Sequence, residues 1–296
     1  MKLSVIVPHY GDAESLRNTL RSASPILEDS DSEIVVVINQ HVSNTEGYRS
    51  SLIAISGIKR LKVLFEPKKG SYAARNTGIR HARNDNLLLL DSDVTLTEKC
   101  LIRLKEVVKQ GLLKKKIYAG KIDIACGESK CVHAYEKIME FDNARSVRKG
   151  AAPTAFLATT KDLFESIGYF REDLLSGADK TWVRKACKAG AELCYDKDML
   201  VIHPSRGTIL AIAKKYRRTY GGWYTIYGCN KAGWAKKIAY LLFALRPPLN
   251  GIARIIKDKN SGRLSKIQAL GILLIIRIAR IDEHIRLSTG SRLRRE

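Results

Sequence analysis

Residues 87–94 read LLLLDSDV, so four consecutive leucines lead directly into two carboxylates one residue apart. Such an apolar run predicts a strand covered on both faces, as in the parallel sheets of α/β proteins, whose ligands bind beyond the carboxyl ends of the strands. Asp91 and Asp93 therefore lie where a ligand is expected. Because neighbouring carboxylates repel each other, a hard divalent cation that binds both would stabilise them and bridge to phosphates. The alternative is ordinary turn and capping chemistry, with Thr97 and Glu98 beginning the next helix.

The first half of the chain alternates short apolar segments with segments of helical pattern. Strands are expected at residues 3–7, 33–38, 61–65 and 87–90, and helices at 13–22, 45–55 and 72–82. This alternation is typical of βαβ units and predicts a parallel sheet flanked by helices.

The middle of the chain is less regular. Strands are expected at 117–125, 154–159 and 199–202, and helices at 132–141, 161–167 and 178–189, the last ending at Gly190. Residues 145–153 are polar and contain glycine and proline, and they are expected to form a loop.

Charge is distributed unevenly along the 296 residues. Residues 205–296 contain 20 Lys and Arg against 4 Asp and Glu, so +16 of the formal charge of +22 lies in the last third. A region this basic favours an anionic surface, either membrane lipid or nucleic acid. No apolar run reaches the roughly 18 residues that a bilayer requires, so a membrane-spanning helix is not expected.

The N-terminus and the cysteines favour a cytosolic location. Residues 3–7 begin a strand at once, and this apolar stretch is too short for a signal peptide. The six cysteines form no Cys-x-x-Cys pair, so they are expected to be reduced and mostly structural, not zinc ligands.

Six short motifs occur in the order known from one enzyme family. They are VIVPHY at 5–10, GSYAARNTG at 70–78, DSD at 91–93, GYF at 168–170, SGAD at 176–179 and HPSR at 203–206. Together they resemble the family 2 glycosyltransferases of the GT-A fold. The resemblance implies an α/β fold with a mixed, mostly parallel sheet flanked by helices. It implies a catalytic domain at 1–225, with a nucleotide-binding half at 1–115 and an acceptor half at 116–225, and leaves a basic amphipathic helical region at 226–296.

The same resemblance implies a metal-dependent, inverting transfer of a sugar from a nucleotide diphosphate sugar. The acceptor would be a hydroxyl of a saccharide or a lipid-linked precursor in cell-surface glycan biosynthesis. Asp91 and Asp93 match the family's DxD pair, with Asp93 as the direct ligand of Mn²⁺ or Mg²⁺. His203 matches a further metal ligand, although a lone histidine after a strand is structural just as often. A cation suits this chemistry because the departing diphosphate gathers negative charge.

A second group of residues matches the family's nucleotide-sugar pocket: Pro8, Tyr10, Asn39, Arg75, Asn76, Asp91 and Ser92. Tyr10 can pack against a base or be a strand-end tyrosine, and Arg75 suits a diphosphate by its charge and planar donor geometry. The family usually has two acidic residues after the second strand, where this chain reads VINQ at 37–40. The amide oxygen of Asn39 can still accept from a uracil N–H, so a UDP-sugar is the expected donor.

The expected catalytic base is Asp179, which matches the acidic residue of the family's Glu-Asp or Gly-Asp motif. On a helix over 178–189, Asp179 shares one face with Trp182, Val183 and Ala186. Helix capping is the alternative role for this aspartate, and Asp173 is the fallback base. Trp182 lines the acceptor site or belongs to the core.

Basic residues after the histidine are expected on the acceptor or lipid side: Arg206, Lys214, Lys215, Arg217 and Arg218. They can bind a diphosphate-linked lipid or anionic headgroups, or form a solvated helix face. In a helix over 264–281, Lys266, Arg277 and Arg280 lie close together. That helix either lies in a membrane interface or packs on the catalytic domain, and attachment to the cytoplasmic face of an anionic membrane is the preferred interpretation.

Two other classes of function are consistent with parts of the sequence. A nucleic-acid-binding protein would use the basic charge but would leave Asp91, Asp93, Asp179 and His203 unexplained, so no nucleic acid partner is expected. A catalytically degenerate GT-A domain, kept as a basic membrane- or nucleic-acid-binding protein, is the main alternative, because Asn39 and Ala178 depart from the family pattern.

Overall fold

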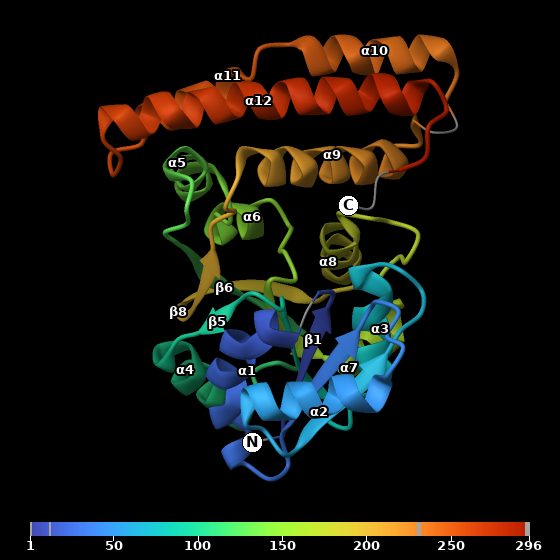
Figure 1. The fold of residues 1–296 in the computed structure, drawn as a ribbon, viewed down its shortest axis with the longest axis vertical. Coiled ribbons are helices and arrows are strands. Elements are labelled where there is room, and N and C mark those ends of the chain that lie inside the picture. Colours follow the sequence, from blue (N-terminus) through green and yellow to red (C-terminus); the bar gives the residue numbers. More distant parts are fainter. Residues whose placement is uncertain (1, 12, 230–231, 294–296) are drawn as a thin grey trace. The chain divides into compact units, whose positions relative to one another are not determined.

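The computed structural model describes residues 2–11, 13–229 and 232–293 (Figure 1). The strands are β1 (Ser4–His9), β2 (Glu33–Ile38), β3 (Leu61–Phe65), β4 (Asn86–Leu90), β5 (Thr95–Leu96), β6 (Lys116–Ala125), β7 (Phe156–Thr160) and β8 (Glu192–Pro204). The α-helices of the first two thirds are α1 (Arg17–Ala23), α2 (Thr45–Ser56), α3 (Ser71–His81), α4 (Glu98–Lys109), α5 (Lys130–Met139), α6 (Asn143–Arg148), α7 (Lys161–Ile167) and α8 (Ala178–Lys188). The later helices are α9 (Ile209–Ile226), α10 (Trp234–Leu245), α11 (Leu249–Lys257) and α12 (Arg263–Ser288), and two 3₁₀ helices are η1 (Ala13–Leu16) and η2 (Ser24–Glu28).

The chain forms two compact units. The first, here called the sheet unit, comprises residues 1–123, 142–172 and 178–203, and the second, the helical unit, comprises 124–141, 173–177 and 204–296. The division at residue 225 expected from the sequence, between a catalytic domain and a helical region, stays a prediction.

The sheet unit is built on an eight-stranded sheet of order β3-β2-β1-β4-β7-β6-β8-β5. Strands β3, β2, β1 and β4 are parallel, whereas β7 is antiparallel to both β4 and β6, and β5 is antiparallel to β8. Every residue of β1 and β2 is buried, as their continuous apolar sequences predict for strands covered on both faces. The mixed, mostly parallel sheet of the sequence analysis is confirmed.

Helix α3 packs directly on β1 and β2. A Cβ atom at Gly78 would collide with the side chain of Ile6, so glycine allows the helix to approach the sheet closely. Tyr72, Arg75 and Asn76 all lie on the buried side of this helix. The close approach therefore brings three side chains of the GSYAARNTG motif toward the ends of the strands.

The prediction of a loop at 145–153 is wrong for its first residues, because residues 143–148 form α6. Asp142 caps this helix by accepting a hydrogen bond from the Arg145 N–H at 3.0 Å, and the Asn143 amide donates to the Gly120 carbonyl at 2.7 Å. A helix of six residues is too short for a periodic signal, so these two polar contacts determine it.

The helical unit consists of stacked helices in which α12 lies between two layers (Figure 1). Helices α5 and α9 pack on one side of α12 and α10 packs on another, whereas α11 contacts both α12 and α5. Val132, Ile212, Ile255 and Ile276 contribute to the shared core. Within the described ranges, no helix is both long and apolar enough to cross a bilayer.

Candidate active site

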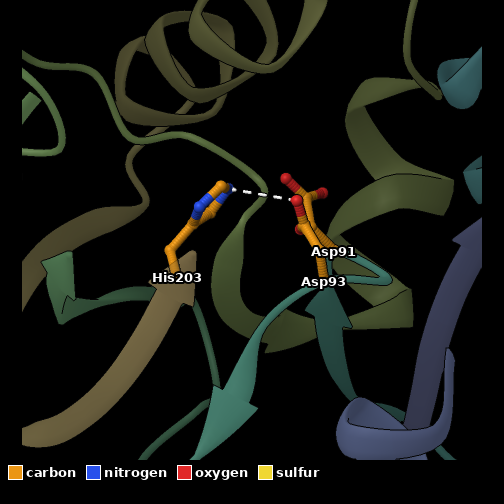
Figure 2. Close-up of side chains that lie close together, drawn as sticks. All are labelled: Asp91, Asp93 and His203. Atoms are coloured by element: carbon orange, nitrogen blue, oxygen red, sulfur yellow. Dashed lines mark ion pairs between the residues drawn. The ribbon is translucent and has the colours of Figure 1, made fainter. Parts of the chain in front are cut away.

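The two carboxylates of the DSD motif and one imidazole meet at the ends of β4 and β8 (Figure 2). One ligand atom from each of Asp91, Asp93 and His203 lies within 4.8 Å of the other two. The His203 Nε2 atom is 3.6 Å from Oδ2 of Asp93, and the His203 side chain is 5% exposed whereas that of Asp93 is 51% exposed. A nearly buried nitrogen and an open carboxylate thus face the same point.

Pairing of β5 with β8 brings His203 to this place. Thr95 lies opposite Ile202 in the antiparallel ladder, so the residues just before Thr95 and just after Ile202 are neighbours. The turn after β4 is held by the Asp91 carbonyl, which accepts from the Val94 N–H at 3.3 Å. The Ser92 carbonyl also accepts from the Thr19 hydroxyl at 2.8 Å. Backbone contacts therefore position the DSD turn, and β5 directs it toward the histidine.

Arg75 forms an ion pair with Asp91 through its Nη2 atom and Oδ1 of the carboxylate. The arginine side chain is 5% exposed, so this guanidinium lies within the protein behind the carboxylate. A buried cation next to one of two neighbouring carboxylates reduces the repulsion between them.

Asp179, in the first turn of α8, is buried and accepts three hydrogen bonds. Its Oδ1 atom accepts from the Tyr72 hydroxyl at 3.1 Å and from the Lys180 N–H at 2.8 Å, and its Oδ2 atom accepts from the Thr154 N–H at 3.4 Å. Burial and the charge of Asp179 raise the pKa of Tyr72, so the phenol stays protonated and donates. Only the Lys180 contact is of the capping type, and the other two reach Asp179 from α3 and from the segment before β7.

Asn39 and Asn76 hold backbone segments around this edge of the sheet. The Asn39 amide donates to the carbonyls of Glu66 and Lys68 at 3.0 and 2.8 Å and accepts from the Gly70 N–H at 2.6 Å. Asn39 thereby fixes the segment that leads into α3. The expectation that its amide faces a base stays a prediction.

The Asn76 amide connects the GSYAARNTG and GYF motifs. It donates to the Phe170 carbonyl and to the Glu172 carboxylate at 2.9 and 2.8 Å, and it accepts from the Phe170 N–H at 3.1 Å. This side chain is 1% exposed, so its polar atoms serve the loop that follows α7.

Comparison with known proteins agrees with this geometry. Residues 4–136 match the model of the protein family described as Glycosyl transferase family 2. Glycosyltransferase AglE of Haloferax volcanii is 28% identical over 220 residues, which cover 73% of this chain and 71% of that protein. These matches support a family 2 glycosyltransferase.

Two further proteins extend the comparison. The poly(ribitol-phosphate) beta-N-acetylglucosaminyltransferase TarP of Staphylococcus aureus is 31% identical over 102 residues, covering 34% of this chain and 31% of TarP. The mannosyltransferase PcManGT of Pyrobaculum calidifontis, solved with GDP-Man and Mn²⁺, superposes with a TM-score of 0.58 at 18% identity, covering 98% of this chain and 87% of that one. This likeness shows the GT-A fold.

Two further residues expected in the nucleotide-sugar pocket of the glycosyltransferase lie at the end of β1. Pro8 is buried in the strand, whereas Tyr10 follows it and is 69% exposed. The ring thus lies exposed just beyond a central strand, and its packing against a base stays a prediction.

Trp182 of the glycosyltransferase packs in the core, which is one of the two roles expected for it, and a contact with the acceptor stays a prediction. Its ring stacks on Phe164 with centroids 4.0 Å apart, and its Nε1–H donates to the Gly168 carbonyl at 2.7 Å. At 3% exposure the side chain has almost no surface to offer a ligand.

Most of the basic residues expected on the acceptor side have acidic partners within the helical unit. Arg206 pairs with the fully buried Glu136, Lys215 with Glu140 at 2.7 Å, and Arg217 with Asp282 at 3.0 Å. Lys214 is exposed and Arg218 is half-buried. These ion pairs neutralise much of the charge that the sequence had suggested for lipid binding.

The pair of Glu140 and Lys215 is tightly coupled. Burial acts to raise the pKa of Glu140, but the Lys215 ammonium and hydrogen bonds from Lys215 and Tyr216 lower it to about 2. Burial lowers the pKa of Lys215, and the Glu140 charge opposes that effect. The Glu140 carboxylate therefore stays ionised at neutral pH, and its ion pair with Lys215 joins the end of α5 to α9.

Sequence reasoning missed Tyr72 and Thr154 as partners of Asp179. Tyr72 lies three and four residues before Arg75 and Asn76, a spacing that places all three on one helix face. That periodicity could have identified Tyr72, whereas nothing in the sequence marks the Thr154 N–H. The fallback base Asp173 lies in the segment 173–177 of the helical unit.

Proposed function

We propose that this glycosyltransferase transfers a sugar, with inversion and with the help of a divalent metal, from a nucleotide diphosphate sugar to a hydroxyl of a saccharide or lipid-linked acceptor. The observation that carries the proposal is the meeting of Asp91, Asp93 and His203 within 4.8 Å at the ends of the strands. Ligands of open α/β sheets bind at this edge.

The donor atoms fit Mn²⁺ or Mg²⁺. Two carboxylates suit either cation, and the imidazole nitrogen of His203 favours Mn²⁺, because Mg²⁺ strongly prefers oxygen ligands. Asp93 is the direct ligand in this proposal, since it is the more exposed carboxylate, and Arg75 fixes Asp91 in place. When bound, the metal would supply positive charge for the leaving diphosphate.

Asp179 is the proposed catalytic base. It would accept the proton of the acceptor hydroxyl while the oxygen of that hydroxyl forms the new bond to the sugar and the nucleoside diphosphate leaves. The Tyr72 hydroxyl and the Thr154 N–H hold the carboxylate in one orientation, which reduces the cost of aligning it with the acceptor.

A UDP-sugar is the proposed donor. The carbonyl oxygen of Asn39 has a second lone pair beyond the one that accepts from Gly70, and the exposed Tyr10 ring can stack on a base. Pro8, Asn76 and Ser92 contribute the shape of this pocket through the backbone that they hold or form. GDP-mannose is the second candidate, because PcManGT was solved with that donor.

We further propose that the acceptor belongs to a cell-surface glycan and that the helical region at 226–296 attaches the enzyme peripherally to the cytoplasmic face of an anionic membrane. The exposed Lys214 of α9 can contact an anionic acceptor or headgroup. A degenerate, inactive domain is not favoured, because Asp91, Asp93 and Asp179 are all present and the first two converge with His203.

The test is calorimetric titration of the full chain with UDP, GDP, dTDP and CDP, with and without Mn²⁺. We expect metal-dependent binding of one nucleotide and its loss in Asp93→Asn. The matched control is Asp31→Asn, which changes an exposed aspartate outside the DSD turn. Equal binding by Asp93→Asn and the control would contradict the metal site, and no binding of any nucleotide by the unmodified enzyme would contradict the donor site.

A further inference from the structure

Helix α12 has an apolar stripe on its exposed side. Ile267, Leu274, Ile278 and Ile285 are between 51% and 66% exposed. They are seven, four and seven residues apart, so at about 100° per residue they lie within about 40° of one another. The opposite side of the helix, with Ile272, Ile276 and Leu287, is buried. The helix therefore has two apolar faces, of which only one has a partner among the described residues.

Helices α10 and α11, which pack along α12, have exposed apolar residues of the same kind. On α10, four of these lie within about 80° of one another at helical spacing. Trp234 is the most exposed of them, at 77%. The set on the two helices is Trp234, Ile238, Leu242, Leu245, Leu249 and Ile256, and together with the α12 stripe it is called here the apolar surface. Exposed apolar residues in such number mark an interaction site.

The charged residues of these helices are unbalanced in sign. Exposed basic side chains are present on or beside all three helices: Lys236, Arg246, Lys257, Lys259 and Arg263. The acidic residues between 232 and 293 are Asp258, Asp282 and Glu283, and the last two pair with Arg217 and Arg286. The partner of the apolar surface is thus expected to combine an apolar interior with negative charge.

The basic stripe expected on α12 does not form the outer surface. Lys266 donates to the Ile256 carbonyl at 2.8 Å, Arg277 donates to the carbonyls of Phe243 and Arg246, and the Arg280 guanidinium lies 4.7 Å from the Tyr216 ring centroid. These three side chains join α12 to its neighbours. The lysines and arginines that remain exposed lie at other positions.

We infer that the apolar surface of α10, α11 and α12 inserts into the headgroup region of an anionic membrane, with the exposed lysines and arginines on the lipid phosphates. This inference rests on the proposed membrane attachment and names the surface responsible for it. Interfacial helices combine an apolar face with Lys and Arg, and tryptophan favours the boundary between water and acyl chains. The inference about the apolar surface does not depend on the proposed metal or donor.

The experiment is co-sedimentation of the full chain with vesicles of equimolar phosphatidylcholine and phosphatidylglycerol, and with phosphatidylcholine alone. The stripe variant carries Ile267→Gln, Leu274→Gln and Ile278→Gln, because glutamine keeps the helix and removes the apolar side chains. Ile102→Gln, at an exposed position of α4, is the matched control. We expect the stripe variant to lose at least about tenfold in partitioning, from the transfer free energy of the three removed groups, and the control to lose nothing.

A second readout reports insertion directly. Trp234 fluorescence should be quenched by bromine-labelled acyl chains, and Trp234→Phe should remove most of this quenching, since Trp182 is buried in the core and Trp223 packs against Tyr220 and Tyr240. The charge variant Lys257→Gln, Lys259→Gln and Arg263→Gln should weaken binding to the anionic vesicles only. Its control replaces three exposed lysines of the sheet unit, Lys59, Lys109 and Lys114.

The outcomes separate this inference from the proposed function. Failure of the unmodified chain to bind anionic vesicles would overturn membrane attachment as a whole, whereas equal binding by the stripe variant would overturn only the apolar surface. If the unmodified chain is a dimer that does not bind vesicles and the stripe variant is a monomer, the apolar surface is the contact with a second copy of the chain. Nucleotide binding, measured on the same preparations, tests the donor site separately and also shows that each variant is folded.

Discussion

The two units distribute charge and apolar surface in opposite ways. Among the described residues of the sheet unit, the exposed large hydrophobic side chains are Tyr10, Ile102 and Tyr195, and carboxylates face the open edge of the sheet. In the helical unit the acidic groups Glu136 and Glu140 are paired inside, and the outer faces of α10 to α12 are apolar. The comparison teaches that carboxylates of the sheet unit are available for a ligand, whereas the buried carboxylates of the helical unit serve its own packing.

The largest effect is expected from Asp93→Asn, which removes an open carboxylate from the ligand cluster. Sugar transfer should fall by roughly a thousandfold, because a metal contributes several kcal/mol to stabilising the leaving group. Rates measured against Mn²⁺ concentration check this, with Asp31→Asn as control. Vesicle binding should not change, and a parallel loss of lipid binding would contradict the division of roles between the units.

The next effect concerns Asp179→Asn. The amide cannot take the hydroxyl proton, so kcat should fall by about a hundredfold to a thousandfold while nucleotide affinity stays the same. Steady-state kinetics and calorimetry on one preparation measure both quantities. Unchanged kcat in a folded variant would show that Asp179 serves only the structure.

In the helical unit, removal of the Glu140 charge should lower the free energy of unfolding and leave catalysis unchanged. Glu140→Gln leaves the Lys215 ammonium nearly buried without its counter-charge, which should lower the free energy of unfolding by about 3 kcal/mol. Denaturant titration measures this loss. Donor binding in the folded variant should match that of the unmodified chain.

The pH dependence of stability provides a second check on the same pair. The folded-state pKa of Glu140 is lowered from 4.5 to about 2, so the carboxylate's contribution is present above pH 4.5 and is lost as the pH falls toward 2. Unfolding free energies across this range should decline less steeply in Glu140→Gln. Identical slopes would mean that the pair does not contribute to acid sensitivity.

The smallest effect is expected from Tyr72→Phe, which removes one hydrogen bond to Asp179 and keeps the ring. A hydrogen bond to a charged group contributes about 1.5–3 kcal/mol, so kcat should fall by about tenfold, with KM for the donor unchanged. Tyr118→Phe, at another buried tyrosine of the sheet unit, is the matched control. Equal kinetics in the two variants would show that Tyr72 does not position the base.

Much of the fold could be predicted from the sequence because its signals are local. The apolar runs at 33–38 and 87–90 became buried strands, and the segments at 45–55 and 161–167 became helices with nearly the expected bounds. The place of Asp91 and Asp93 follows from the strand before them, because residues that directly follow a parallel strand lie at the carboxyl edge of the sheet. Two-residue β5 and six-residue α6 were missed because elements this short have no measurable period.

The partners of the site residues were decided by contacts between distant parts of the chain. His203 reaches Asp93 only through the pairing of β5 with β8, and Tyr72 reaches Asp179 across 107 residues. Periodicity indicates which residues share a face of a helix, but it does not tell which neighbour covers that face. The sequence thus determined the strands, the acidic motif and the family, whereas the tertiary structure alone buried Trp182, turned Arg280 inward and left the apolar side of α12 exposed.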